Sequence, residues 1–255
     1  MDSTKATIQI DRRDSYALVT LRQSALTAAM LDELLSAFSE LQNDASVRVV
    51  LLTGTGSFFA TNPELKDLSP EQARTFSLKG QTLTRLLETL GKPVIAAING
   101  LASSGGCDLA LACAWRIAAP NAAFSYPEIS SGFLPAFGGA VRLAKIIGKA
   151  RALELLLTGK SLFADDALNF GLVNRTVSLP EDLLPNCKTL AQRISRNAPV
   201  AIKYAIETVN FAAEASLEDG LRFESSLFGL CFATEDVAEG TNAFLEKRQP
   251  VFKGR

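Results

Sequence analysis

The sequence contains no histidine. This absence excludes a Ser-His-Asp triad, a Cys-His dyad and any metal site with imidazole ligands. The chain of 255 residues has only four cysteines, too few for a disulfide framework, and no two of them have Cys-x-x-Cys spacing. They are Cys107, Cys113, Cys187 and Cys231. Acid–base chemistry must therefore use carboxylates, lysine, tyrosine, cysteine, serine or backbone groups.

Long apolar runs and an excess of one charge are also missing. Gly, Ser or charged residues interrupt each apolar stretch well before the roughly 18 residues that a transmembrane helix needs. The 26 basic and 27 acidic residues give a net charge of -1, which provides no basic surface for nucleic acid. The first residues, MDSTKATIQIDRRD, lack the apolar core of a signal peptide. We therefore expect a cytoplasmic protein with no membrane span, no nucleic-acid partner and no metal.

What the sequence does contain is an alternation of strand and helix patterns. Short apolar runs that end in glycine occupy residues 47–54 and 93–100, and apolar residues at helical spacing occupy 28–42 and 71–91. We also expect a hairpin within residues 6–22 that turns near 12–15, a helix at 104–113, and strands at 115–119 and 123–129. Buried strands that alternate with helices predict an α/β fold.

From about residue 136 onward the pattern becomes helical. The predicted helices span 138–148, 149–159, 164–174, 181–197, 198–213, 216–231 and 234–248. The last part of the chain is rich in apolar residues, among them Phe223, Leu227, Phe228 and Leu230.

Two segments have a composition suited to chemistry. The first, NGLASSGGCDLALAC (99–113), runs from a strand end into a helix start through small residues, which allow backbone N–H groups to approach a ligand closely. The alternative is that these residues only permit tight packing of strand against helix. Neither the Gly-x-Gly-x-x-Gly nor the Gly-Lys-Ser/Thr spacing of a nucleotide-binding loop is present.

The second segment, SYPEISSGFLPAFGGAVRL (125–143), places Glu128 in largely apolar surroundings. Such surroundings disfavour the charged carboxylate and raise its pKa, which suits a group that both takes and gives a proton. The alternative is an exposed loop residue or a structural hydrogen-bond acceptor. With Asp108 in the first turn of the preceding helix, Glu128 forms a pair of acids beside a helix start that is rich in backbone donors.

Residues 91–175, and more weakly the chain from about residue 20 to its end, resemble the enoyl-CoA hydratase/isomerase (crotonase) family. The resemblance implies a core of repeated ββα units at residues 1–195. It also implies a C-terminal helical region at 196–255 that mediates oligomerisation into trimers or hexamers.

The resemblance further implies an enzyme that processes acyl-CoA in fatty acid metabolism. Two backbone N–H groups of such enzymes form an oxyanion hole for the thioester oxygen. Gly105 matches one donor position, whereas the other aligns with Pro63, which has no N–H. Glu128 matches one family glutamate, and Asp108 stands at the position of the other with a side chain one methylene shorter.

The resemblance also implies residues that contact the substrate or its CoA group, and no cofactor other than the CoA carried by the substrate. Among these residues, Phe252 and Lys253 match positions that reach the CoA of a neighbouring subunit in many relatives. The alternative interpretation of Lys253 is a solvated cation in the C-terminal tail. The implied residues are Ala60, Asn62, Leu65, Lys66, Gly106, Phe252 and Lys253.

Three functions remain open at this point. The first is hydration of 2-enoyl-CoA or isomerisation of enoyl-CoA, with Glu128 and Asp108 as acid and base. The second is decarboxylation or C–C bond cleavage of β-oxo acyl thioesters, favoured by the departures at Pro63 and Asp108. The third is acyl-CoA binding without catalysis.

Overall fold

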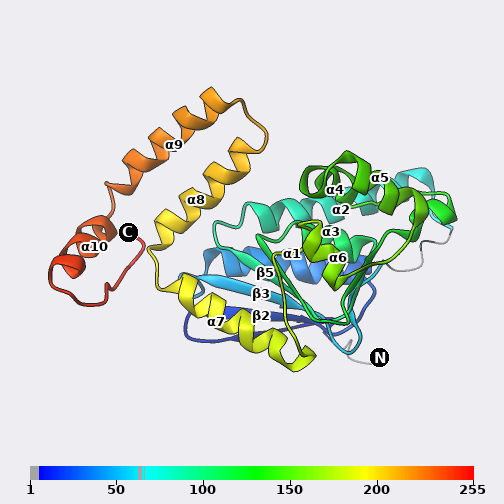
Figure 1. Ribbon diagram of the computed structural model, residues 1–255, viewed down its shortest axis with the longest axis horizontal. Helices are drawn as coiled ribbons and strands as arrows, with labels where there is room; N and C mark the ends of the chain where they lie inside the picture. Colours follow the sequence, from blue (N-terminus) through cyan, green and yellow to red (C-terminus); the bar gives the residue numbers. More distant parts are fainter. Residues whose placement is uncertain (1–5, 63–64, 66) are drawn as a thin grey trace.

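The computed structural model describes residues 6–62, 65 and 67–255 (Figure 1). It contains two β-sheets, and the chain passes from one to the other several times. The larger sheet has the strand order β1-β2-β3-β5-β7-β10 and the smaller the order β4-β6-β8-β9. The larger comprises β1 (Ile8–Arg12), β2 (Tyr16–Leu21), β3 (Val49–Thr53), β5 (Val94–Ile98), β7 (Trp115–Ala118) and β10 (Arg175–Thr176). The smaller comprises β4 (Phe58–Ala60), β6 (Leu101–Ser103), β8 (Ala123–Ser125) and β9 (Leu162–Phe163).

The larger sheet begins with the predicted hairpin and continues with parallel strands. β1 and β2 pair antiparallel, whereas β2, β3, β5 and β7 pair parallel in that order. Every residue of β3 and β5 is buried, as a strand covered on both faces requires. The α/β class predicted from the sequence is confirmed.

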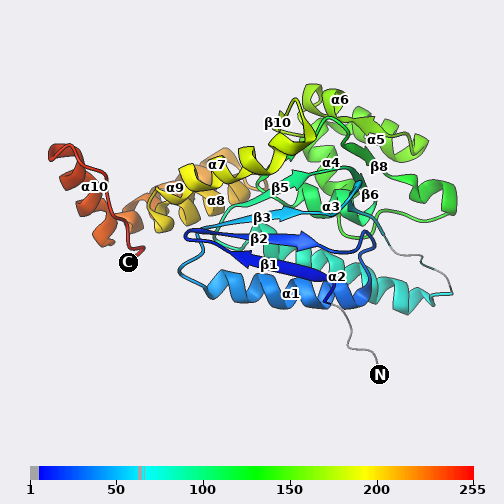
Figure 2. The same cartoon turned by 90° about the horizontal axis from the view of Figure 1, so that it is seen from below.

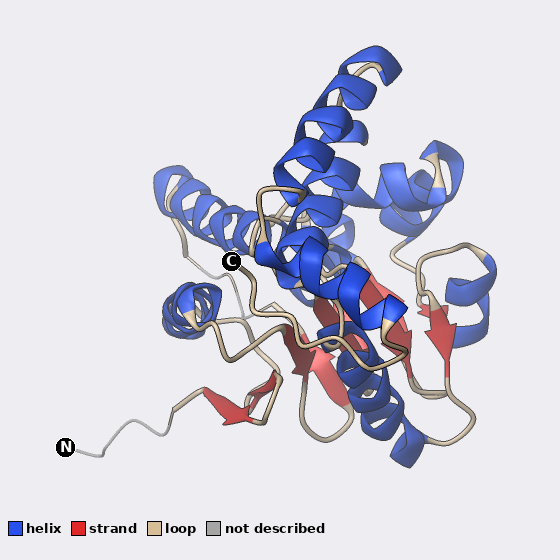
Figure 3. Cartoon of the chain, turned by 90° about the vertical axis from the view of Figure 1, so that its left-hand side faces the viewer, coloured by secondary structure: helices blue, strands red, loops and turns tan. Residues whose placement is uncertain are grey.

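Helices cover both faces of the larger sheet (Figures 2 and 3). One face, with Val50 and Leu52 of β3, packs in the same apolar core as α1 (Ala28–Asn43) and α2 (Pro70–Glu88). The other face, with Val49 and Leu51, packs against α7 (Leu183–Ser195). The alternation of side chains along one strand therefore supplies two separate cores.

Three short strands of the smaller sheet each follow a strand of the larger sheet, in the pairs β3–β4, β5–β6 and β7–β8, whereas β9 follows α5. The sequence patterns did not predict β4, β6, β9 or β10, each of which has two or three residues. The strand predicted at 123–129 was wrong at its end, because β8 stops at Ser125 and Pro127 begins a 3₁₀ helix, η1 (Pro127–Ser131). Proline has no N–H to continue a strand ladder.

The remaining helices divide into those near the smaller sheet and those in the last part of the chain. The first group contains α3 (Gly105–Leu111), α4 (Gly139–Ile147), α5 (Lys149–Thr158) and α6 (Ala164–Asn169), followed by the 3₁₀ helix η2 (Pro180–Asp182). The second contains α8 (Pro199–Ala212), α9 (Leu217–Cys231) and α10 (Glu235–Leu245).

Helices α8, α9 and α10 extend away from the sheets (Figure 1). They expose large apolar side chains, including Phe228, Phe232, Phe244 and Leu245. These features fit the region predicted at 196–255, and its role in oligomerisation stays a prediction. Within the described residues, every helix is too short or too polar to span a lipid bilayer.

Asn99, at the end of β5, connects the two sheets. Its Oδ1 accepts the N–H of Gly54 at 3.0 Å, and its Nδ2 donates to the carbonyls of Gly56 and Phe58 at 3.1 and 3.0 Å. One side chain thus holds the loop from β3 to β4 against the end of the neighbouring strand. This loop sets the position of β4.

We expect Asn99→Ala to lower the free energy of unfolding by about 2 kcal/mol, because it leaves backbone groups of the β3–β4 loop without partners. Urea denaturation measures this change. Asn121→Ala is the matched control, since the exposed side chain of Asn121 donates to the carbonyl of Asn99, and loss of this exposed bond should have little effect. Equal stability of the two variants would contradict the role of Asn99.

Candidate active site

The end of β4 passes directly over the start of α3. A β-carbon added at Gly106 would lie 1.9 Å from the carbonyl oxygen of Ala60, so no larger residue fits without moving the backbone. All residues of α3 are buried. Ser104, which precedes the helix, has a φ of 56°, a backbone conformation that residues other than glycine rarely adopt. The close approach brings β4 and the helix start into one site.

Asn62 and Gly105 meet at this point. The N–H of Gly105 donates to Oδ1 of Asn62 at 3.0 Å. Nδ2 of Asn62 is buried and has no hydrogen-bond partner in the described part of the chain. Of the sequence-predicted residues, Ala60, Asn62, Gly105 and Gly106 therefore lie together.

Glu128 is a second buried group without a partner. It lies in η1 and is 2% exposed. Neither carboxylate oxygen has a hydrogen-bond partner among residues 6–62, 65 and 67–255. Burial raises the pKa of Glu128 above its ordinary value. A carboxyl group with a raised pKa and free oxygens is suited to accept a proton and return it.

Asp108 is fully buried, but its oxygens are engaged. The hydroxyl of Tyr126 donates to Oδ1 at 2.9 Å, and the N–H of Phe137 donates to Oδ2 at 2.8 Å. Burial, and to a smaller extent the charge of Glu128, raise the pKa of Asp108 to about 7, against the opposing effect of these hydrogen bonds. Tyr126 lies two residues before Glu128, so its bond to Asp108 joins the segment that carries Glu128 to the start of α3.

The segment before α4 fits closely around Asp108. A β-carbon added at Gly139 would lie 1.7 Å from Oδ1 of Asp108 and 2.5 Å from the hydroxyl of Tyr126. Only glycine is compatible with this arrangement. The buried ring of Phe137 closes the site on the side of Phe76, with the two ring centroids 5.2 Å apart.

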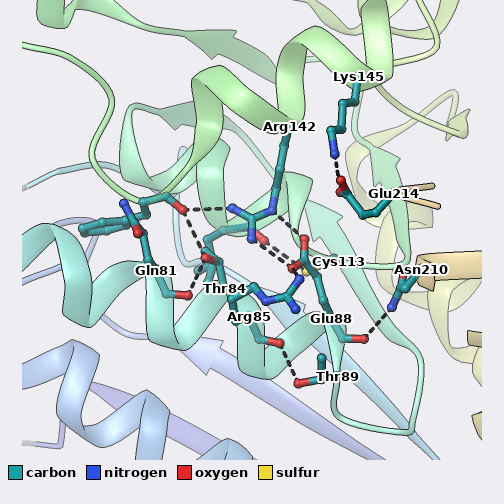
Figure 4. Close-up of polar contacts among 12 residues, drawn as sticks. Gln81, Thr84, Arg85, Glu88, Thr89, Cys113, Arg142, Lys145, Asn210 and Glu214 are labelled. Carbon is teal, nitrogen blue, oxygen red and sulfur yellow. Dashed lines mark hydrogen bonds and ion pairs between the residues drawn. The ribbon is translucent and has the colours of Figure 1, made fainter. Parts of the chain in front are cut away.

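The backbone of Phe137 is held from its other side by a polar network (Figure 4). Its carbonyl oxygen accepts from Thr84 Oγ1 at 3.1 Å and from Arg142 Nη1 at 2.9 Å. The remaining guanidinium nitrogens of Arg142 donate to both carboxylate oxygens of Glu88, at 2.6 and 3.0 Å. This bidentate pair fixes the residue whose N–H binds Asp108.

The sequence did not predict the contacts of Tyr126 and Phe137 with Asp108 or the contact of Asn62 with Gly105. Tyr126 had a usable signal, since a tyrosine next to a proline in an apolar segment needs a partner for its hydroxyl when buried. The backbone contact of Phe137 had no signal in the sequence.

The other predicted residues take no part in the contacts just described or lie outside the described residues. Pro63 and Lys66 lie outside them. Leu65 lines a surface pocket of about 550 Å³ together with Thr27, Ala28, Phe76 and Lys79, among others.

Phe252 and Lys253 contact residues of α10, namely Gly240 and Asp236, and α10 lies well away from α3 (Figures 1 and 2). The carbonyl of Phe252 accepts from Arg48, and the N–H of Lys253 donates to Asp236. The structure thus does not bring these two residues to Glu128 of the same chain.

Comparisons with known proteins match the chain over nearly its full length. The sequence pattern described as "Enoyl-CoA hydratase/isomerase" matches residues 11–255. The chain is 40% identical to the short-chain-enoyl-CoA hydratase of Clostridium acetobutylicum, over 96% of this chain and 97% of the relative. It is 39% identical to the crotonyl-CoA hydratase of Syntrophomonas wolfei, with the same coverage of both chains.

Solved structures agree with the sequence comparison. The crystal structure of an enoyl-CoA hydratase from Bacillus anthracis has a TM-score of 0.93 and 34% identity, and covers 98% of this chain and 100% of that one. The resemblance and the crotonase-like fold predicted from the sequence are confirmed.

The buried position of Asp108 predicts a pH-dependent contribution to stability. Its pKa in the folded protein, about 7, is above the ordinary value of 3.8, so the folded state binds this proton more tightly than the unfolded chain. The contribution is fully present below the ordinary pKa and is lost as the pH rises through about 7. Asp108→Asn removes this titration.

We therefore expect the unfolding free energy of the wild type to fall more steeply between about pH 4 and about pH 7 than that of Asp108→Asn. The difference should be at least about 1 kcal/mol, because one unit of pKa shift corresponds to about 1.4 kcal/mol. Denaturant titrations at each pH measure it. Asp165→Asn, which removes an exposed carboxylate, should keep the wild-type slope, and a parallel slope for Asp108→Asn would be inconsistent with the assignment.

Proposed function

Because the chain belongs to the enoyl-CoA hydratase/isomerase family, we propose that it hydrates 2-enoyl-CoA thioesters with Glu128 as the principal acid and base. The names of the relatives, a short-chain-enoyl-CoA hydratase and a crotonyl-CoA hydratase, support crotonyl-CoA as the first substrate to test. The CoA group arrives as part of the substrate, and no other cofactor enters the proposal.

The observation that carries the proposal is the unpaired carboxylate of Glu128. A buried carboxyl group without hydrogen bonds reduces stability, and such groups are concentrated at functional sites. Its raised pKa brings it closer to the pH at which a proton can be taken and returned. Because electrostatic interactions are stronger in a low-dielectric environment, burial also strengthens the interaction between the charge of Glu128 and a bound thioester.

In the proposed reaction, the thioester oxygen accepts the N–H of Gly105, which withdraws electrons from the conjugated double bond. The oxygen of a water molecule forms a bond to carbon 3 while Glu128 takes one proton from that water. The resulting enolate then receives a proton at carbon 2, and Glu128 supplies it. The product is a 3-hydroxyacyl thioester, and Glu128 returns to its starting state.

Asp108 has a supporting role in this proposal. Its bonds to Tyr126 and to the Phe137 N–H keep a second ionisable group beside Glu128, and the two acids interact electrostatically. Ionisation of one disfavours ionisation of the other, which helps to keep one proton available in the site.

Isomerisation is the second candidate reaction, and the engaged oxygens of Asp108 favour it. An isomerase needs only one group to move a proton between carbons 2 and 4, and Glu128 has the free oxygens for that transfer. Cleavage of β-oxo thioesters, or binding without turnover, remain as outcomes that the experiment below distinguishes. Assembly into trimers or hexamers and a cytoplasmic location are also part of the proposal, and light scattering at micromolar concentration tests the first.

We expect wild-type protein to convert crotonyl-CoA in ¹⁸O-labelled water to 3-hydroxybutyryl-CoA that carries ¹⁸O, as measured by mass spectrometry. Glu128→Gln should lower kcat by about 1000-fold or more, because it removes the only proton carrier in two transfers. Glu181→Gln, an exposed substitution, serves as the control. Migration of the double bond of 3-enoyl-CoA without ¹⁸O would identify an isomerase instead.

Lack of turnover with either enoyl-CoA would reject both reactions. Turnover of a malonyl or β-ketoacyl thioester would then assign the second function class. Saturable binding of crotonyl-CoA with no turnover of any thioester would assign the third.

A further inference from the structure

The carboxamide of Asn62 is the one side-chain amide hydrogen-bonded to Gly105 in the described residues. Its Oδ1 accepts the Gly105 N–H at 3.0 Å, while its Nδ2 is buried and unpartnered in the same part of the chain. An N–H₂ group carries two donor protons, and burying it without an acceptor costs free energy. The Gly105 N–H, in contrast, is already occupied.

Binding of a thioester as proposed above changes both the bond between Oδ1 and the Gly105 N–H and the surroundings of Nδ2. The thioester oxygen takes the Gly105 N–H, so Oδ1 of Asn62 must release it. Rotation about the terminal torsion of asparagine, which has a broad energy profile, exchanges Oδ1 and Nδ2. The unpartnered N–H₂ group then faces the oxygen that has displaced Oδ1.

The residue that aligns with the second donor position of the family has no backbone N–H. The residue after Asn62 is Pro63, and a proline carries no backbone N–H. An oxyanion hole with Gly105 alone would have one donor, and loss of one of two donors typically lowers kcat by about 100- to 1000-fold.

We propose that the side chain of Asn62 supplies the second donor of the oxyanion hole, through Nδ2, and that it holds the Gly105 N–H in place until the thioester arrives. This inference rests on the proposed function, because it assigns a donor for the thioester oxygen of that reaction. Nδ2–H and the Gly105 N–H then both point to the negative charge that develops on that oxygen. Asn62 is accordingly a catalytic residue, and no covalent step involves it.

The test compares Asn62→Ala, Asn62→Asp and the exposed control Asn186→Ala with the wild type on crotonyl-CoA. Asn62→Asp keeps the shape and the acceptor of the side chain but removes the donor. If Nδ2 is a donor, both Asn62 variants should lose about 100-fold or more in kcat with little change in KM. If Asn62 only blocks Gly105, Asn62→Ala should instead raise kcat/KM, and that result would overturn the proposal.

A second measurement separates lost hydrogen bonding from misfolding. Infrared difference spectra of crotonyl-CoA with a ¹³C-labelled carbonyl, bound to the Glu128→Gln variant, report how strongly the thioester carbonyl is polarised. Adding Asn62→Ala to that variant should reduce the downshift of the carbonyl stretch while the labelled ligand remains bound. An unchanged stretch would contradict a hydrogen bond from Asn62.

The outcomes also distinguish this inference from the proposed function. If the wild type hydrates crotonyl-CoA and Asn62→Ala is equally fast, the inference is wrong and the function stands. If the wild type binds crotonyl-CoA without converting it, the function is wrong, and the carbonyl stretch alone decides the role of Asn62. Failure of the wild type to bind the thioester would contradict both.

Discussion

The close approach of β4 to the start of α3 is the constraint on which the site depends. Gly106 has no β-carbon, and this lets the carbonyl of Ala60 pass at a distance that any other residue would prevent. Asn62, two residues further along, then reaches the N–H of Gly105. The smaller sheet fixes this geometry, because Ala60 of β4 pairs with Ala102 of β6, directly before the helix start. The requirement for glycine at position 106 and the position of the Gly105 N–H, which we propose as an oxyanion donor, therefore have the same origin.

The two buried acids show how differently the protein treats similar groups. Asp108 is stabilised by the Tyr126 hydroxyl and the Phe137 N–H, and Gly139 leaves room for its carboxylate. Glu128 has none of these contacts, although burial raises the pKa of both. Hydrogen bonds to the ionised form offset part of the desolvation for Asp108, and the described residues provide no such bond to the carboxylate of Glu128.

The sequence was sufficient to predict the features that depend on local patterns. Apolar runs ending in glycine located β3 and β5, and the hairpin and helices followed from periodicity. The three-residue strands β4 and β6 are too short to show a period, and the end of β8 was misjudged because Pro127 stops the strand. The contact between Asn62 and Gly105 joins positions 43 residues apart, and its partners are a side chain and a backbone group. No local pattern encodes such a contact, so only the folded structure reveals it.

The network around Arg142 joins the site to the helices that extend from the sheets. Asn210 of α8 donates to the carbonyl of Glu88, Glu88 binds Arg142, Arg142 binds the carbonyl of Phe137, and the N–H of Phe137 binds Asp108. Each link is a direct hydrogen bond between packed elements, and together they form a contiguous mechanical connection from α8 to a buried acid. The same network thus links the placement of α8 to that of the Phe137 N–H, whose hydrogen bond is one of the groups that lower the pKa of Asp108 against the effect of burial.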